Sequence, residues 1–139
     1  MGHMADPVDH VDNEEILYRR VPFGWFDRRV SPNPTADAFR PHPTADTDGL
    51  SFERARYKTP EDVAVGRSKY PYHVAEVRVS DLRALGLTIS VTENDPSHVL
   101  VPELNSANYK SDRTYEVAQI IAERHATIVL DRTPSADAG

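Results

Sequence analysis

A strict alternation of apolar and polar residues predicts that residues 72–79 form the central β-strand of the fold. A period of two, with β-branched residues among the apolar positions, is typical of a strand with one buried face. His73 shares its side of this segment with Val77 and Val79, so we expect a partly buried histidine whose ring nitrogens are hydrogen-bonded. Short β-prone segments predict the other strands at residues 16–21, 50–57, 87–91, 98–101 and 127–130.

A helical repeat of apolar residues predicts the longest helix near the C-terminus. The helix is expected to begin after Ser111 or Asp112 and to end at about Arg124. Two shorter helices are predicted at residues 60–65 and 80–86, the first capped by Thr59 and the second capped by Ser80. The apolar stripe of the long helix is wide enough to pack on a sheet, and it comprises Tyr115, Val117, Ala118, Ile120, Ile121 and Ala122.

The order of these elements predicts an α+β fold in a single compact domain. We expect a mostly antiparallel, twisted sheet with one long C-terminal helix and two short helices. The domain should span residues 16–132 of the 139 in the chain. Residues 1–15 begin with a cloning remnant and continue as an acidic stretch, which predicts a disordered tail or a segment that docks on a basic partner. Residues 133–139 are predicted as a second disordered tail.

A long, proline-rich connection at residues 31–48 follows the first strand. Loops of this length inside a compact domain are often functional. We expect Phe39 to anchor the middle of this loop in the core, with Arg40 and His42 placed to face a ligand. The aromatic cluster at Phe23–Phe26 precedes the loop and either fills the core or forms a platform for a partner.

Composition and charge exclude several classes of function. The formal net charge of −6 argues against broad binding to DNA or RNA, which requires a basic face. The chain has no cysteine and no pair of histidines at metal-binding spacing, so no metal site is expected. Its six glycines are not clustered, which excludes a glycine-rich phosphate loop, and no Gly-x-Ser-x-Gly elbow is present. No apolar run approaches the roughly 20 residues that cross a bilayer, so we expect a cytoplasmic protein without a membrane partner.

The remaining candidate chemistry is basic and polar. The planar fork of arginine binds phosphate at two points, and a neighbouring tyrosine can stack on a base. The same arginines could instead be surface charges that balance the 22 acidic residues. The candidate residues are Arg19, Arg20, Ser51, Arg54, Tyr57, Arg67, His98 and Glu103.

The segment at residues 57–67 resembles ADP-ribosyltransferase-fold proteins, in which an aromatic-x-Ser/Thr strand end precedes a short, alanine-containing helix. RNA 2′-phosphotransferases continue with a Val-Gly-x-Arg element, and Val65-Gly66-Arg67 is similar to it, with one residue less in the spacing. Leu17-Tyr18-Arg19 is similar to the arginine-bearing strand of the wider fold, which includes the bacterial RES-domain toxins that consume NAD. A strand at 74–79, a turn and helix at 81–86, and Val101-Pro102 extend the resemblance.

The resemblance implies NAD as the cofactor and ADP-ribosyl or phosphoryl-end transfer as the chemistry. It implies that Arg19 holds the diphosphate, that Ser51 supports the nicotinamide ribose, and that Tyr57 stacks on the nicotinamide. Arg67 would contact a second phosphate or the acceptor. Glu103 is the nearest match by position to the acidic catalytic residue, which stabilises the cationic ribosyl transition state.

Two functional hypotheses follow for this chain. The first is a domain that binds a phosphate-bearing, nucleotide-like ligand, with its arginines, Tyr57 and Glu103 converging on one concave site. Arg54 and His98 are additional ligand-binding candidates in this hypothesis. The alternative is a non-catalytic protein-interaction module that uses the Phe23–Phe26 cluster and the proline-rich loop, with a flat apolar patch around Trp25.

Overall fold

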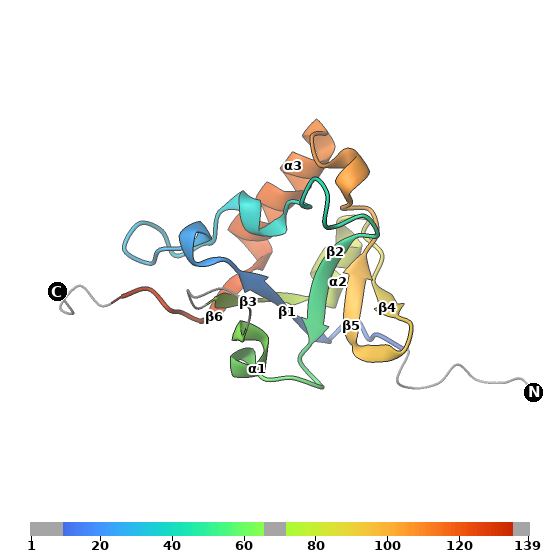
Figure 1. Ribbon diagram of the computed structural model, residues 1–139, viewed down its shortest axis with the longest axis horizontal. Helices are drawn as coiled ribbons and strands as arrows, with labels where there is room; N and C mark the ends of the chain where they lie inside the picture. Colours follow the sequence, from blue (N-terminus) through green and yellow to red (C-terminus); the bar gives the residue numbers. More distant parts are fainter. Residues whose placement is uncertain (1–9, 66–71, 135–139) are drawn as a thin grey trace, which may run out of the picture.

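The strands of the computed structural model, which describes residues 10–65 and 72–134, form one antiparallel sheet (Figure 1). The strand order is β4-β5-β2-β1-β3-β6. The α+β prediction, with a mostly antiparallel sheet and one long C-terminal helix, is confirmed. The strands are β1 (Ile16–Val21), β2 (Leu50–Arg54), β3 (His73–Arg78), β4 (Ser90–Thr92), β5 (Asp95–Val101) and β6 (Thr127–Leu130).

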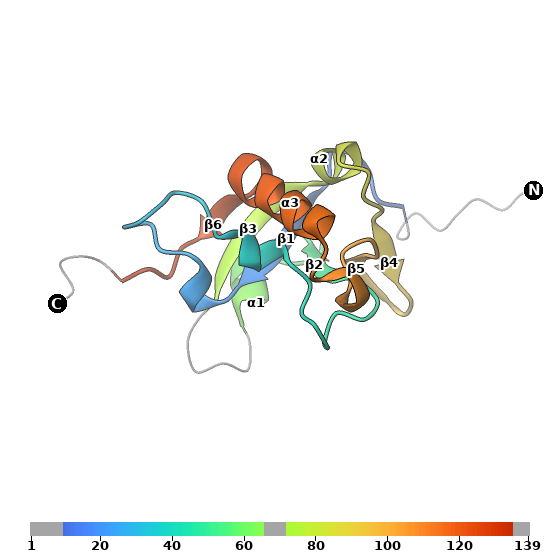
Figure 2. The same ribbon diagram turned by 90° about the horizontal axis from the view of Figure 1, so that it is seen from above.

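The helices cover both faces of this sheet. Helix α3 (Asp112–Ile120) continues as a π-helical turn (Ile121–His125) and lies across one face, as Figure 2 shows from above. Helix α1 (Pro60–Ala64) lies against the opposite face (Figure 1). Helix α2 (Val79–Ala84) directly follows β3. Short 3₁₀ turns occur at η2 (Phe23–Trp25), η3 (Ala36–Phe39) and η4 (Ser106–Asn108).

The core lies between the sheet and α3. Leu17, Phe52 and Val77 point to this face from three neighbouring strands and are buried. Phe39 is fully buried, so the prediction that it anchors the proline-rich loop is confirmed. Tyr115 was predicted to join the buried stripe of α3, but 47% of it is exposed. The buried stripe comprises Thr114, Val117, Ala118, Ile121 and Ala122.

Strand β3 is buried on both faces along its first half, whereas the sequence predicts one buried face. His73 and Ala75 face the main core, while Val74 packs on Val63 and Ala64 of α1. The short helix therefore covers the second face of the strand. Its start matches the prediction, because the Thr59 hydroxyl accepts from the Asp62 amide and the Asp62 carboxylate accepts from the Thr59 amide.

Helix α2 begins one residue earlier than predicted and has no side-chain cap. Arg78 occupies the N-cap position, and the predicted cap, Ser80, lies within the helix. The amides of Val79 and Ser80 donate to the carbonyls of Glu15 and Asn13, at 2.9 Å each. Backbone from a distant segment thus satisfies the free amides that a capping side chain would otherwise satisfy.

Residues 10–15 pack on the domain, although the sequence places them in a disordered tail. The Glu15 carboxylate pairs with Arg54 at 2.6 Å, and Val11 is buried. The Arg83 guanidinium donates to the Val11 carbonyl at 2.8 Å. The folded part of the chain therefore begins before residue 16. Residues 1–9 and 135–139 of the predicted tails lie outside the described residues.

The region around β4 differs from its predicted form. Strand β4 begins at Ser90 rather than at residue 87, because Leu87 is buried in the core after the turn at Gly86. Strand β5 begins at Asp95, within the segment predicted as a turn. The turn itself lies at residues 93–94, where Asn94 adopts a positive φ of 68°.

The sheet opens between β1 and β2. Strand β1 pairs with β3 along its whole length, from Ile16↔Arg78 to Val21↔His73. Its register with β2, within the described strands, covers Leu17↔Arg54 and Tyr18↔Glu53. Beyond these pairs the strands diverge (Figure 1), and a cavity of about 560 Å³ lies along the opening.

Candidate functional site

A cavity of about 560 Å³ lies where β1 and β2 diverge. Its floor is formed by residues of β1, β2 and β5, and its walls by η2, α1 and the connection from η3 to β2. Arginines, histidines, tyrosines and carboxylates all border it. Residues that line the cavity include Tyr18, Arg19, Arg20, Trp25, Asp37, Arg40, His42, Asp46, Ser51, Glu53, Val63, Tyr72, His98 and Tyr109.

Arg19 holds the two diverging strands together at the cavity. Its Nε donates to the Ala38 carbonyl at 2.8 Å, and its Nη1 donates to the Ser51 carbonyl at 2.9 Å. Burial lowers the pKa of Arg19 to about 10, although nearby Asp46 opposes this shift. The side chain therefore stays charged at neutral pH. No carboxylate of residues 10–65 or 72–134 lies within ion-pair distance of it, so its charge is not neutralised by a direct partner.

Arg20 and Arg40 add positive charge to the walls. The Nε of Arg20 donates to the Val63 carbonyl at 2.8 Å, and its guanidinium lies 5.2 Å from the centre of the Tyr72 ring. Arg40 contacts Asp37 Oδ1 at 3.4 Å. The Nε of Arg40 is buried and has no hydrogen-bond partner among the described residues. Guanidinium groups held in this way, next to aromatic rings, suit an anion that carries a ring.

His42 offers a hydrogen-bond donor of fixed orientation. Its Nδ1 accepts from the backbone amides of Thr44 at 3.1 Å and Ala45 at 3.0 Å. A backbone amide can only donate, so the ring proton resides on Nε2. The turn is completed by the His42 amide, which donates to Asp46 Oδ2 at 2.6 Å. Arg40 and His42, which are expected from the sequence to face a ligand, both border the cavity.

A row of three polar side chains crosses the cavity floor. Tyr18 of β1 is paired with Glu53 of β2, which is paired with His98 of β5. Directly opposed residues on antiparallel strands place their side chains about 5 Å apart on one face. Glu53 Oε2 is buried without a hydrogen-bond partner among the described residues, and Lys58 Nζ lies 3.5 Å from it.

The two residues that flank Glu53 differ in their hydrogen bonding. His98 Nδ1 hydrogen-bonds the Thr92 hydroxyl. Burial raises the pKa of Tyr18, and the charges of Glu76 and Glu61 raise it further. Tyr18 is therefore a neutral phenol at pH 7 and can donate a hydrogen bond into the cavity.

The structure brings together some of the candidate residues and separates others. Arg19, Ser51 and His98 line the cavity. Arg54 is fully buried on the core side, where it pairs with Glu15, and Tyr57 lies beside it, with the guanidinium 5.2 Å from the ring centre. Neither Arg54 nor Tyr57 lines the cavity.

Glu103 lies apart from this cavity. Glu103 borders a separate hollow of about 360 Å³, where its carboxylate accepts from the Thr88 amide at 2.9 Å and the Thr88 hydroxyl at 2.6 Å. Burial acts to raise the pKa of Glu103, but the bonds from Thr88 outweigh it and hold the pKa below the usual range. Arg67 lies outside the described residues.

Glu53 and Tyr18 were not among the candidates from the sequence. The alternation of β1 and β2 places each on the face away from the core, but it does not show which strands are neighbours. Only the register across β1, β2 and β5 places Tyr18, Glu53 and His98 in one row. Tyr72 and Tyr109 also reach the cavity, from segments with no pattern that predicts it.

The aromatic cluster fills the core and forms part of the cavity wall. Phe26 is buried, and Trp25 packs on the core while bordering the cavity. His73 is fully buried and lies between Phe23 and Phe26, with ring centres 5.6 and 5.0 Å away. The His73 Nδ1 accepts from the Arg132 amide, so its Nε2 carries the proton that is donated to the Phe23 carbonyl at 3.1 Å.

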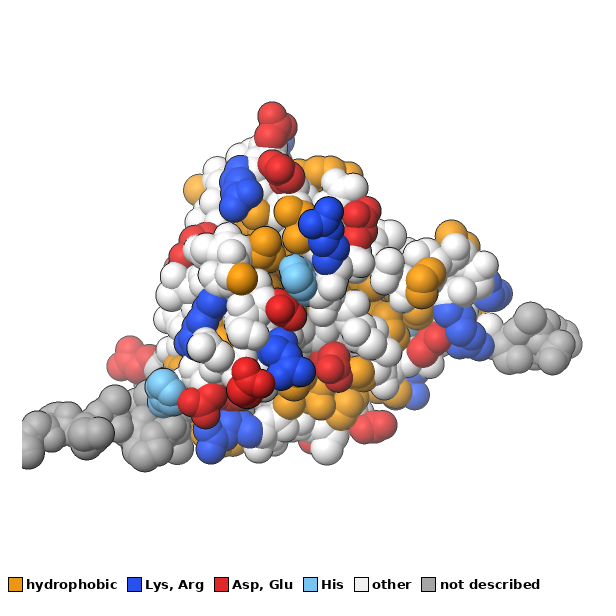
Figure 3. Space-filling view, turned by 180° about the vertical axis from the view of Figure 1, so that it is seen from behind, with side chains coloured by type: hydrophobic (Ala, Val, Ile, Leu, Met, Phe, Trp, Pro, Cys, Tyr) orange, Lys and Arg blue, Asp and Glu red, His pale blue; other side chains and the backbone are white. Residues whose placement is uncertain are grey.

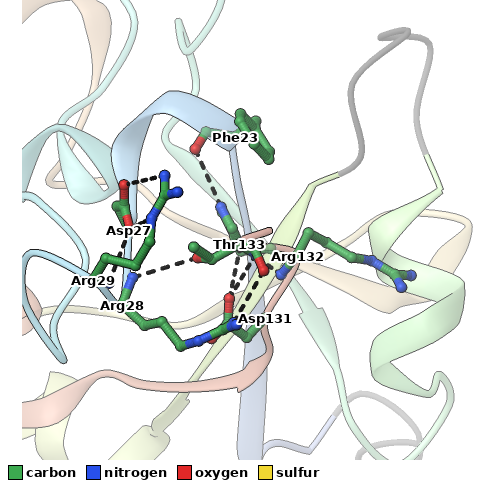
Figure 4. A network of polar contacts seen from close by, with 8 residues as sticks. Phe23, Asp27, Arg28, Arg29, Asp131, Arg132 and Thr133 are labelled. Atoms are coloured by element: carbon green, nitrogen blue, oxygen red, sulfur yellow. Dashed lines mark hydrogen bonds and ion pairs between the residues drawn. The ribbon is translucent and has the colours of Figure 1, made fainter. Parts of the chain in front are cut away.

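The C-terminal segment holds this wall in place (Figure 4). Arg28 Nη1 donates to Asp131 Oδ2 at 2.9 Å and to the Thr133 carbonyl at 3.1 Å. The Thr133 amide donates to Asp131 Oδ1 at 2.7 Å. Burial acts to raise the pKa of Asp131, but these bonds outweigh it and hold the pKa below its usual range.

Charge on the outer surface is mixed. On the face opposite to that of Figure 1, acidic and basic side chains are interspersed, so charge of one sign does not accumulate there (Figure 3). No group of three histidine, aspartate or glutamate residues within the described ranges is arranged to hold a metal ion. None of the helices described here has the length and apolarity required to cross a membrane.

Comparisons of the chain with protein-family models, with curated proteins and with solved structures found no match.

Proposed function

We propose that the protein binds a phosphate-bearing, nucleotide-like ligand in the cavity between β1 and β2. The observation that carries this proposal is Arg19, a charged and partly buried guanidinium at the cavity whose acceptors among the described residues are the backbone carbonyls of Ala38 and Ser51. Charge-assisted hydrogen bonds from arginine to phosphate are among the strongest that proteins make. A dianionic phosphate would neutralise a charge that the fold leaves without a direct carboxylate partner.

The other residues that line the cavity favour a ligand that carries both an anionic group and a ring. Arg20 lies beside Tyr72, and Trp25 forms another part of the wall. The volume of about 560 Å³ falls in the range of small-molecule sites, roughly 300–1,000 Å³. The mixture of apolar rings and a few oriented polar groups is also typical of such sites.

NAD-dependent ADP-ribosyl transfer, in the cytoplasm, is the activity that we propose to test first. Arg19 and Ser51, to which the resemblance assigns the diphosphate and the nicotinamide ribose, lie together at the cavity. Tyr57 and Glu103 lie elsewhere, so other cavity residues would have to stack on the nicotinamide and stabilise a cationic transition state.

The test is a titration of the full chain with NAD, ADP-ribose, AMP and a 5′-phosphorylated RNA end, followed by backbone amide NMR shifts. We expect saturable shifts at the residues of the cavity. Arg19→Gln should weaken AMP binding about 10- to 100-fold, because a hydrogen bond to a charged group contributes about 1.5–3 kcal/mol.

Arg78→Gln is the matched control, because Arg78 is exposed and its ion pair is with Glu14, away from the cavity. It should leave AMP binding unchanged. Absence of shifts at millimolar ligand, or equal weakening by the two variants, would contradict the proposed function.

A further inference from the structure

Two buried side-chain polar atoms lack a hydrogen-bond partner in the part of the chain that the structure describes, and both belong to residues that line the cavity. They are Arg40 Nε, a donor, and Glu53 Oε2, an acceptor. Such atoms are rare in folded proteins, and each calls for an explanation. Both atoms are closed to solvent, so a ligand supplies their partners only when the two side chains turn toward the cavity, and it must then present an acceptor group and a donor group.

Glu53 defines the chemistry of the donor group. An ionised carboxylate can only accept hydrogen bonds, so the part of a ligand beside it must carry hydroxyl or amine hydrogens. Lys58 Nζ lies 3.5 Å from Oε2, but 37% of the lysine side chain is exposed, so this ion pair is weak. A phosphate would be repelled by the carboxylate.

The arginine and carboxylate parts of the lining are separated along β2. Arg19 donates to the carbonyl of Ser51, and Glu53 lies two residues further along the strand. Two residues of a strand span about 7 Å. Arg19 leaves the core face and reaches the opening, whereas Glu53 points away from the core, so this step measures only the spacing of the two positions along the cavity. That spacing has the scale of one sugar ring, with a 5′-phosphate at one position and the ring hydroxyls at the other.

We infer that the ligand is a 5′-phosphorylated ribonucleoside and that Glu53 accepts hydrogen bonds from its 2′- and 3′-hydroxyls. Vicinal hydroxyls match a single carboxylate, since they can donate to its two oxygens, and an acidic residue serves the ribose in this way in dinucleotide-binding folds. This inference rests on the proposed function and adds the sugar to it: Glu53 selects ribose, while Arg19 binds the phosphate.

The experiment compares AMP with 2′,3′-dideoxy-AMP as probes, using NMR shift titrations or calorimetry. The wild-type chain should bind AMP about tenfold or more tightly than the dideoxy compound, because a buried carboxylate left without donors is costly. In Glu53→Gln the preference should fall to about threefold or less, since the neutral amide loses the charge-assisted bonds. Glu61→Gln, at an exposed position of α1 outside the cavity, should retain the wild-type preference.

The outcomes separate this inference from the proposed function. If AMP and dideoxy-AMP bind equally tightly and both are weakened by Arg19→Gln, ribose selection is refuted while phosphate binding stands. If Glu53→Gln keeps the wild-type preference for AMP over dideoxy-AMP, Glu53 does not bind the ribose hydroxyls. If neither nucleotide binds, both proposals fail.

A second measurement covers the case in which Glu53→Gln does not fold. The ¹³C shift of the Glu53 side-chain carboxyl in the wild-type chain should move with AMP and not with dideoxy-AMP. Equal movement with both probes would overturn the inference.

Discussion

Two arginines on the same face of neighbouring strands differ in burial and in whether they pair with a carboxylate. Arg19 reaches the edge of the cavity and bonds to backbone carbonyls. Arg54 is fully buried and bonds to the Glu15 carboxylate and the carbonyls of His10 and Pro96. The sequence suggests ligand binding for both, because alternation fixes the side of the strand and not the partner. Glu15 lies 39 residues from Arg54, and no local pattern connects them.

Glu15→Gln tests this buried ion pair. The substitution removes the negative charge bonded to a buried guanidinium, so the free energy of unfolding should fall by about 3–5 kcal/mol in chemical denaturation. The neighbouring Glu14→Gln is the control. Glu14 pairs with Arg78 at the surface, with 83% and 46% of the two side chains exposed, so its loss should cost at most about 1 kcal/mol. Similar losses for the two variants would show that Glu15 does not neutralise a buried charge.

At the scale of elements, the turn before β2 fixes how β2 meets β5 and therefore where Ser51 and Glu53 lie. Gly49 has a φ of +132°, which L side chains rarely adopt. An added Cβ would lie 2.6 Å from the Val101 carbonyl oxygen, and Val101 is the register partner of Leu50. The glycine allows the two strands to approach each other at the start of their ladder.

Gly49→Ala should lower the free energy of unfolding by about 2 kcal/mol or more, because it combines backbone strain with a clash against backbone. Gly24→Ala is the matched control, since a Cβ there meets no heavy atom within 4 Å. Its effect should stay within about 0.5 kcal/mol. Thermal or chemical denaturation of both variants measures the difference, and equal stability would contradict the close approach at Gly49.

The elements were more predictable than the site for a physical reason. Strands β1 and β6 have the predicted bounds, because short β-prone runs with clear ends depend on local sequence alone. The row from Tyr18 to His98 depends on which strands pair and in what register, which is a property of the whole sheet. The proline-rich loop gave a partial signal: it singled out Arg40 and His42, which border the cavity, but it could not reveal the divergence of the strands that forms the cavity.

At the scale of the whole molecule, residues 10–15 and 131–133, at the two limits of the described structure, contact parts remote in sequence. Residues 10–15 join β2 to α2, and residues 131–133 join Arg28, after η2, to β3. The second contact supports the wall that contains Trp25. It also carries the carboxylate of Asp131, whose bonds to Arg28 and Thr133 require the charged form.

Asp131→Asn tests this contact through pH. The pKa of Asp131 is lower in the folded state, so its contribution is fully present above the ordinary aspartate pKa of about 3.9 and is lost as pH falls through the lower folded-state value. The wild-type chain should be about 1 kcal/mol more stable than the variant at pH 7. That advantage should shrink as the pH falls below about 4, as measured by chemical denaturation across pH. An advantage that grows on acidification would contradict the assigned sign.

The opening between β1 and β2 also has a mechanical consequence. The sheet consists of two three-stranded halves, β4-β5-β2 and β1-β3-β6, and a short ladder with the Arg19 side chain joins them. A ligand that contacts Arg19 on one half and Glu53 on the other is a non-covalent cross-link between them. Occupancy of the cavity would then raise the stability of the whole sheet in proportion to the logarithm of ligand concentration. With the ligand bound, the two halves would unfold together. Without the ligand, the short ladder between β1 and β2 would be the first part of the sheet to open.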